Sequence, residues 1–198
     1  VETAQHRLLY DTGPAYAPGA DGGSRVILPY LRMRGIAGLD GLVISHSDTD
    51  HTGGAQALLE GADVGWLASS LADDHPVVRA ARRHVRCAAG QHWEWDGIAF
   101  DMLHPLVASY GDAHLKANAR SCTLRISNGH RTVLLAGDIE AAQEASLLER
   151  ARDRLRADVL LAPHHGSGTS STSAFLQAVR PGVAIFQVGW RNRYHHPK

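Results

Sequence analysis

Four side chains able to bind a metal ion lie within six residues of each other, immediately after an apolar run. His46, Asp48, Asp50 and His51 belong to the segment His-Ser-Asp-Thr-Asp-His, which follows the run Gly41–Ser45. A strand that ends in such a loop delivers imidazoles and carboxylates to one edge of a rigid sheet. The alternative is a solvated polar loop in which Asp and His form turns and cap helices. We favour a metal site, because similar residues recur later in the chain.

Three other apolar, strand-like runs also end in residue types that bind metals. Asp11 ends the first, Asp138 ends the second, and His164 and His165 end the third. Short apolar strands alternate with helical stretches in both halves of the chain, which indicates sheets covered by helices. Ligand sites form at the strand ends of such sheets. The sequence therefore predicts an α/β fold that gathers these residues at strand ends.

The composition is neutral and rich in histidine. The 198 residues include 20 basic and 20 acidic side chains, so no overall positive charge favours nucleic acid. With 13 histidines and 2 cysteines, the chain is suited to imidazole and carboxylate metal sites more than to thiolate sites. For Cys87 and Cys122 we favour two packed or free thiols, and one disulfide stays open as the alternative.

The length fits one domain with a sizeable core. No apolar run approaches the roughly 18 to 20 residues that cross a bilayer, and no charged-then-apolar leader precedes the first strand. A strand pattern begins at Val1 without a lead-in, and the chain stops directly after a motif-like segment. We therefore expect residues 1–198 to form a single domain that is cut from a longer protein.

Apolar spacing and turn residues predict the elements. Helices are expected over 25–35, 55–60, 76–86, 141–156 and 173–179. Strands are expected over 6–11, 41–45, 64–68, 93–95, 98–103, 121–126, 132–136, 158–162 and 183–188. The pair Asn128-Gly129 predicts a hairpin, and residues 108–119 predict a surface loop. Trp93 and Trp95 share one strand face, which predicts that they pack against a sheet or a partner domain.

Four motifs together resemble a known family. They are Ser45–Gly54, Leu135–Glu140, Pro163–Ser167 and Asn192–Pro197. The first resembles the signature loop of the metallo-β-lactamase superfamily, and the last two together are similar to the C-terminal domain of the ComEC family of DNA-uptake channel proteins. The resemblance covers essentially the whole chain. It implies an αββα metallo-β-lactamase sandwich with a two-metal site between the sheets.

The resemblance also implies which residues bind two divalent metal ions. The first ion is expected on His46, Asp48 and Asp138, and the second on Asp50, His51, Asp138 and His165. Two departures from the family pattern concern the first ion: Asp48 replaces a histidine, and the histidine expected before the Asp138 strand is missing, with Asn118–Ser121 in its place. Hard carboxylate ligands make the metal zinc or manganese.

Other residues are expected around these ligands. Asp11 matches a family position that supports the ligand loop by holding a nitrogen of a ligating histidine, and an Asx turn is an equal alternative. Because adjacent residues on an extended strand end point in opposite directions, we expect only one of His164 and His165 to bind metal, and the family pattern favours His165. His164 would then donate to a phosphoryl oxygen or to the leaving group.

The catalytic candidates are Asp50, His164 and His196, and the substrate-binding candidates are Ser167, Arg191, Asn192 and Arg193. A hydroxyl near a helix start and forked guanidinium groups are suited to phosphate. Helix capping by Ser167 is the alternative for that residue, and a solvated surface position is the alternative for the others.

The resemblance implies a metal-dependent phosphodiesterase that acts as a nuclease on single- or double-stranded DNA and degrades the strand that is not taken up during transformation. It implies a soluble domain of an inner-membrane protein, on the periplasmic side, that contacts other domains of the channel and needs no small organic cofactor. Two alternatives stay open. One is a phosphodiesterase for a small phosphodiester such as a phosphocholine ester, and the other is a metal-stabilised domain that guides DNA without turnover.

Overall fold

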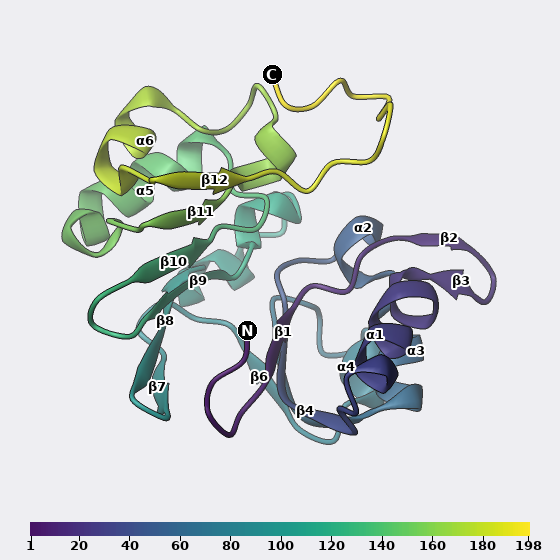
Figure 1. The fold of residues 1–198 in the computed structure, drawn as a ribbon. Coiled ribbons are helices and arrows are strands. Elements are labelled where there is room, and N and C mark those ends of the chain that lie inside the picture. The colour runs from purple at the N-terminus through teal and green to yellow at the C-terminus, as the bar shows by residue number, and fades with distance from the viewer. The chain divides into compact units, whose positions relative to one another are not determined.

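A computed structural model describes residues 1–198, which divide into two compact units, Val1–Cys87 and Ala88–Lys198 (Figure 1). Each unit combines a β-sheet with helices, so the predicted α/β class is confirmed. None of the helices has the length and apolar character needed to cross a membrane. The expectation that the whole chain forms one domain stays a prediction.

The first unit is built on a parallel sheet of four strands in the order β1-β4-β5-β6. These strands are β1 (Leu8–Tyr10), β4 (Gly38–Ile44), β5 (Asp63–Ser69) and β6 (His84–Arg86). A small antiparallel pair is formed by β2 (Ala15–Ala17) and β3 (Ala20–Asp21). The α-helices are α1 (Leu28–Met33), α2 (Thr49–Thr52), α3 (Ala55–Gly61) and α4 (Pro76–Ala80), and a π-helical turn spans Gly23–Ile27 before α1.

Helices α1, α3 and α4 cover one face of this sheet (Figure 1). The buried side chains between them include Leu28, Leu31, Leu42, Ile44, Leu58, Leu67 and Val77. Because the strands are parallel, their carboxyl ends meet at one edge of the sheet. Asp11 follows β1 and His46 follows β4, so the sheet brings both residues to that edge.

Close backbone packing holds the segment after β4. Thr12 donates to the carbonyl oxygen of His51 through its amide, at 2.9 Å, and through Oγ1, at 2.8 Å. A Cβ atom on Gly54 would lie 2.2 Å from the amide nitrogen of Gly23 and 2.5 Å from the carbonyl oxygen of Thr12. Glycine is required at position 54 because no side chain fits between these segments.

The second unit is built on a sheet of six strands in the order β12-β11-β10-β9-β8-β7. The strands are β7 (His92–Trp95), β8 (Ile98–His104), β9 (Thr123–Ser127), β10 (Thr132–Leu135), β11 (Val159–Leu161) and β12 (Val183–Ile185). Neighbours from β7 to β10 are antiparallel, whereas β10, β11 and β12 are parallel. The α-helices are α5 (Ala141–Ala151) and α6 (Ser173–Val179), and short 3-10 turns span 107–111, 118–120, 152–154 and 163–166.

The apolar core of this unit lies between α5, α6 and strands β10 and β11. Its buried side chains include Leu134, Leu147, Leu155, Leu160, Phe175 and Val179. On β7, the Trp93 ring stacks on Phe100 with centroids 4.9 Å apart, which confirms that the tryptophans pack against the sheet. The parallel strands β10, β11 and β12 again place the residues that follow them at one edge, and these include Asp138, His164 and His165.

The structure corrects the expectations for one helix and for the two cysteines. The helix predicted over 76–86 ends at Ala80, and His84–Arg86 form strand β6 instead, because they gain a hydrogen-bonded partner in Leu67–Ser69 of β5. Cys87 and Cys122 are buried and neither is a free thiol, so the preference for two thiols is wrong. The hairpin at Asn128-Gly129 is confirmed, since β9 and β10 pair on either side of it.

Candidate metal centre

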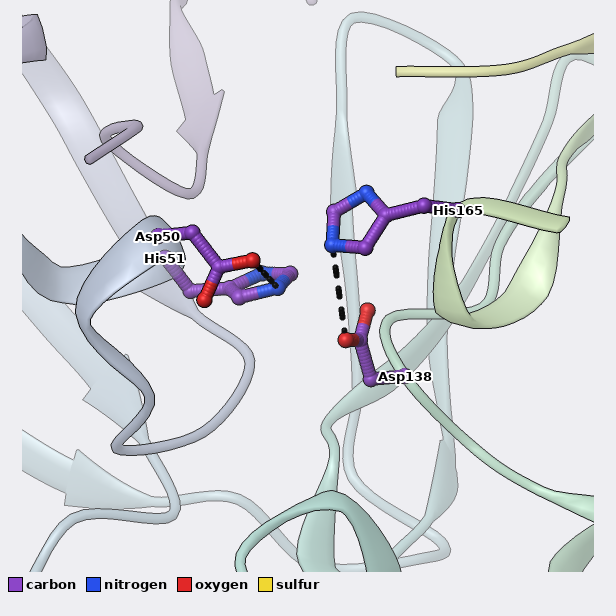
Figure 2. Close-up of side chains that lie close together, drawn as sticks. All are labelled: Asp50, His51, Asp138 and His165. Carbon is purple, nitrogen blue, oxygen red and sulfur yellow. Dashed lines mark ion pairs between the residues drawn. The ribbon is translucent and has the colours of Figure 1, made fainter. Parts of the chain in front are cut away.

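The first unit carries four predicted metal ligands, which we call the N-terminal ligand set: His46, Asp48, Asp50 and His51. The imidazoles of His46 and His51 are buried and their ring centroids lie 4.2 Å apart. The two carboxylates are about half-exposed. Nε2 of His46 lies 3.5 Å from Oδ2 of Asp48, and Nε2 of His51 lies 3.7 Å from Oδ2 of Asp50 (Figure 2). The set therefore presents two imidazole-carboxylate pairs.

These separations are longer than the usual 2.7–3.2 Å of a hydrogen bond. Two ligand atoms that each lie about 2.1 Å from one ion in a tetrahedral arrangement are roughly 3.4 Å apart. The two pairs are therefore spaced as donors that share a metal ion are spaced.

Asp11 and Ser45 fix the orientation of both imidazoles. Asp11 Oδ2 lies 2.8 Å from Nδ1 of His51, and it also accepts from Ser45 Oγ at 2.8 Å. Since the Ser45 hydroxyl proton goes to Asp11, Ser45 Oγ accepts from Nδ1 of His46, at 3.0 Å. Both histidines thus carry their proton on Nδ1, so the lone pair is on Nε2, which is the nitrogen that could bind a metal ion.

Asp11 makes these contacts from a left-handed backbone conformation, with φ of 58°. Its other oxygen, Oδ1, accepts from the amide of Ser45 at 2.7 Å. Both carboxylate oxygens therefore accept from groups of the ligand loop. In the Asx-turn alternative, the carboxylate would instead accept from the backbone amide two residues further along the chain.

The second unit carries a C-terminal ligand set, which consists of the predicted ligands Asp138 and His165 together with the neighbouring His164. Asp138 is buried, and its amide donates to Ser121 Oγ at 3.0 Å. Oδ2 of Asp138 lies 3.5 Å from Nε2 of His165 (Figure 2) and 4.0 Å from Nε2 of His164. The carboxylate therefore has an imidazole nitrogen of each histidine beside it, and the shorter separation, from His165, is the one suited to shared metal coordination.

The backbone at the two histidines is left-handed rather than extended. His164 has φ of 48° and His165 has φ of 55°, and Gly166 continues with φ of 79°. Consecutive non-glycine residues in this region are strained, at a cost of about 1–3 kcal/mol each, and such strain is concentrated at functional sites. The expectation that the two side chains point in opposite directions is wrong, because it assumed an extended strand end.

Each histidine of this set is also held through Nδ1. His165 Nδ1 donates to the carbonyl oxygen of Gln187 at 2.8 Å, which leaves Nε2 as the donor toward Asp138. His164 Nδ1 lies 3.1 Å from Thr169 Oγ1 and 3.3 Å from Oε1 of Glu140. Thr169 donates its hydroxyl proton to Glu140 at 2.7 Å, so His164 Nδ1 is the donor in its contact with Thr169.

Three residues around this set were not among the predicted site residues. They are Asn118, Glu140 and Gln187. Asn118 Nδ2 lies 3.5 Å from Nε2 of His164, and this asparagine is in the segment where the family pattern has the missing histidine. Glu140 lies in the motif that contains Asp138, which was a usable signal. Gln187 contributes only its backbone carbonyl, for which no side-chain signal exists.

Ser167 lies on the turn that follows the two histidines. Its Oγ lies 3.1 Å from Thr169 Oγ1, and its amide donates to the carbonyl oxygen of His164 at 2.8 Å. Thr172, not Ser167, caps helix α6 by accepting from the amide of Phe175. Helix capping is therefore excluded as the role of Ser167, and substrate contact stays a prediction.

The segment after β12 carries the remaining candidates. Asn192 accepts from the amide of His196 and donates to its carbonyl oxygen, both at 2.9 Å. The His196 ring centroid lies 6.1 Å from that of His164, and Nδ1 of His196 is buried without a hydrogen-bond partner. Partial burial, and then the nearby His164 and His165, lower the pKa of His196. Arg191 and Arg193 are exposed on the same segment.

A family model described as metallo-beta-lactamase superfamily matches residues 1–190. The chain belongs to the metallo-β-lactamase superfamily. This family comprises metal-dependent hydrolases whose fold binds divalent metal ions, and the donor sets described above fit such ions. The match spans both compact units.

Two relatives match almost the whole chain. The chain is 38% identical over 197 residues to Competence protein ComA of Neisseria gonorrhoeae. This alignment covers 100% of this chain and 26% of that protein. The chain is 36% identical over 191 residues to Recombination protein 2 of Haemophilus influenzae. This alignment covers 96% of this chain and 22% of that protein. The chain thus spans about a quarter of the length of these relatives, and it matches the C-terminal domain of ComEC-type proteins.

A solved structure supports the fold. The metallo-beta-lactamase fold protein YhfI from Bacillus subtilis has a TM-score of 0.52 at 16% identity, over 94% of this chain and 78% of that chain. The predicted metallo-β-lactamase fold class and the resemblance to the ComEC family are therefore both confirmed. The individual ligand, catalytic and substrate-binding roles stay predictions.

Proposed function

We propose that this superfamily member is a metal-dependent phosphodiesterase that acts as a nuclease on DNA. The observation that carries the proposal is the anchoring of the histidines. His46, His51 and His165 each use Nδ1 in a hydrogen bond and turn Nε2 toward a carboxylate at 3.5–3.7 Å. A solvated polar loop has no need of such anchoring, whereas metal ligands regularly show it.

The two ligand sets would hold two divalent ions, zinc or manganese. His46 and Asp48 would share the first ion with Asp138, and Asp50, His51 and His165 would share the second ion with the same carboxylate. When bound, such ions polarise the phosphoryl group, make a water molecule more acidic and neutralise developing negative charge. Asp48 and Asp50 supply anionic oxygen ligands, which favour hard divalent ions.

His164 would move a proton at Nε2. Its Nδ1 proton is held by Thr169 and by the carboxylate of Glu140, which orients the ring. Nε2 then faces the Asp138 carboxylate, where the phosphate would be bound, and from there it can donate to the leaving oxygen. His196, whose ring centroid lies 6.1 Å from that of His164, would contribute a further hydrogen bond to the phosphate.

The DNA substrate is supported by the relatives, because their names refer to competence and recombination. The neutral net charge means that phosphate must be bound locally, by residues such as Ser167, Arg191 and Arg193. We further propose that the chain is the extracytoplasmic part of an inner-membrane channel protein and contacts its other domains.

The test is hydrolysis by the purified chain with manganese or zinc. The substrates are single-stranded DNA, double-stranded DNA and a panel of small phosphodiesters that includes a phosphocholine ester. Metal stoichiometry is measured in parallel by elemental analysis. DNA cleavage that is lost on addition of chelator, and is lost in the double variant Asp50→Ala with Asp138→Ala, is the expected result. Asp74→Ala, which removes an exposed carboxylate of the same size, is the control and should cleave normally.

Other results would assign a different function. Cleavage of the small phosphodiesters with DNA inert would replace the nuclease by a small-molecule phosphodiesterase. One tightly bound ion and no cleavage with any metal would indicate a guiding domain. Full activity in the double variant would exclude the two-metal assignment.

A further inference from the structure

The segment after β12 places aromatic rings and cations side by side on the surface. Trp190 is 91% exposed, which is unusual for the largest apolar side chain. The guanidinium of Arg191 lies over the Trp190 ring, 5.9 Å from its centroid, and that of Arg193 lies over the Tyr194 ring at 4.7 Å. Each exposed ring therefore has a positive charge beside it.

This segment has a fixed shape. Asn192 closes it by bonding both backbone groups of His196, and its own amide donates to the carbonyl oxygen of Gly189 at 3.2 Å. The amide of Lys198 donates to the carbonyl oxygen of Gly166 at 2.9 Å, which ties the end of the segment to the turn that carries His165. The backbone that carries the rings and guanidinium groups is thus shaped before any ligand binds, which lowers the entropic cost of binding.

The same segment encloses an open hollow of about 540 Å³. It is lined by Val188, Gly189, Trp190, Arg191, Asn192, His195 and His196. This volume is within the 300–1,000 Å³ that is usual for small-ligand sites. An aromatic face, a guanidinium and imidazoles in one hollow match a nucleotide, because the ring stacks on a base and the cations pair with phosphate.

We infer that this hollow binds one unpaired nucleotide of a single DNA strand, with its base on Trp190 and its phosphate at Arg191. The inference rests on the proposed nuclease function and adds the form of the substrate. In a duplex both faces of each base are covered by stacking, so only an unpaired base can offer a face to Trp190. A series of rings then runs from this segment to the ligand set: Tyr194 lies 5.6 Å from His196, and His196 lies 6.1 Å from His164. A strand held at Trp190 is thereby directed toward the proposed catalytic histidine.

The experiment measures binding of fluorescein-labelled oligo(dT) and of a duplex of equal length by anisotropy, in chelator so that no cleavage occurs. Trp190→Leu keeps apolar volume but removes stacking, and we expect it to bind oligo(dT) about 5- to 100-fold more weakly, with duplex affinity unchanged. Trp190→Phe should recover most of the loss. Tyr16→Ala removes an exposed aromatic ring in the first unit and should bind both DNAs as the unaltered chain does.

Three results would overturn the inference. They are an unchanged oligo(dT) affinity in Trp190→Leu, an equal loss for oligo(dT) and duplex, and a change confined to the self-association of the chain, which would assign the segment to a protein partner. Because binding is measured without metal, this result can be interpreted even if the proposed nuclease activity is not found. Conversely, loss of the Trp190 effect leaves the cleavage test untouched.

Discussion

The carboxylate of Asp11 lies 2.8 Å from Nδ1 of His51, although forty positions separate the two residues in the sequence. The parallel pairing of β1 with β4 creates this contact, because it places the residue after β1 beside the loop after β4. The contact fixes the proton on Nδ1 and directs Nε2 to the ligand side. A residue outside the ligand set therefore determines how one of its histidines is presented.

Asp11→Asn should weaken metal binding about 10- to 100-fold. The amide has only one acceptor oxygen, whereas the carboxylate accepts from His51, from the Ser45 hydroxyl and from the Ser45 amide. The affinity for zinc is measured by competition with a chromophoric chelator. Asp40→Asn is the matched control, because Asp40 accepts from the amide of Arg7 at 2.7 Å and touches no ligand histidine. Equal zinc affinities in the two variants would contradict the role of Asp11.

The sequence was sufficient to predict the strand ends and what they carry. Apolar runs end shortly before Asp11, His46, Asp138 and His164, and the structure has a strand at each of these runs. Such runs can be recognised locally because a strand that is buried on both faces needs apolar side chains along its length. The hairpin at Asn128 was also predictable from local sequence, because the Asn128 side chain accepts from the amides of residues 130 and 131 within the turn itself.

Long-range features could not be predicted in this way. His84–Arg86 continue a helical pattern in sequence, but pairing with β5 outweighs that preference. The anchoring of His165 by the carbonyl oxygen of Gln187 depends on the parallel pairing of β11 with β12, and backbone carbonyls have no sequence signature. The left-handed conformation of His164 and His165 could not be predicted from the sequence either, because histidine has no strong intrinsic preference for that conformation.

The stability of the second unit should fall as the pH drops below about 6.5. His104 is buried, its Nε2 donates to the carbonyl oxygen of Ala119 at 2.9 Å, and burial lowers its pKa from 6.5 to about 4. Below pH 6.5 the unfolded chain binds a proton on this histidine that the folded chain does not. The resulting loss of unfolding free energy reaches about 3 kcal/mol near pH 4 and is constant below that pH.

Urea unfolding at pH 7 and at pH 4.5 measures this loss. Other groups also titrate in this interval, so the informative quantity is the difference between the unaltered chain and His104→Gln, which keeps a donor for Ala119 but does not titrate. We expect the unaltered chain to lose roughly 2 kcal/mol more than the variant between the two pH values. Parallel losses in both proteins would show that His104 is not the group responsible.

Gly54→Ala should destabilise the first unit and weaken metal binding. Its Cβ would overlap the amide of Gly23 and the carbonyl of Thr12, and Thr12 is the residue that holds the backbone of His51. Forced overlap of this kind costs about 1–3 kcal/mol. Urea unfolding and zinc competition measure the two effects. Gly111→Ala is the control, because no atom lies within 4 Å of its Cβ position, and it should change the unfolding free energy by less than about 0.5 kcal/mol.

Replacing His164 separates backbone strain from chemistry. At φ of 48° glycine is unstrained, whereas any residue with a Cβ atom is not. His164→Gly should therefore be about 1 kcal/mol more stable than His164→Ala, although both variants lack the imidazole and both should be inactive as phosphodiesterases. Thermal unfolding gives the stability difference. At the exposed His114, where φ is not positive, the same pair of substitutions should show the opposite order, because glycine costs more backbone entropy there. If alanine is the more stable residue at both positions, the left-handed conformation of His164 stores no strain, and the argument from strain to function at this turn is lost.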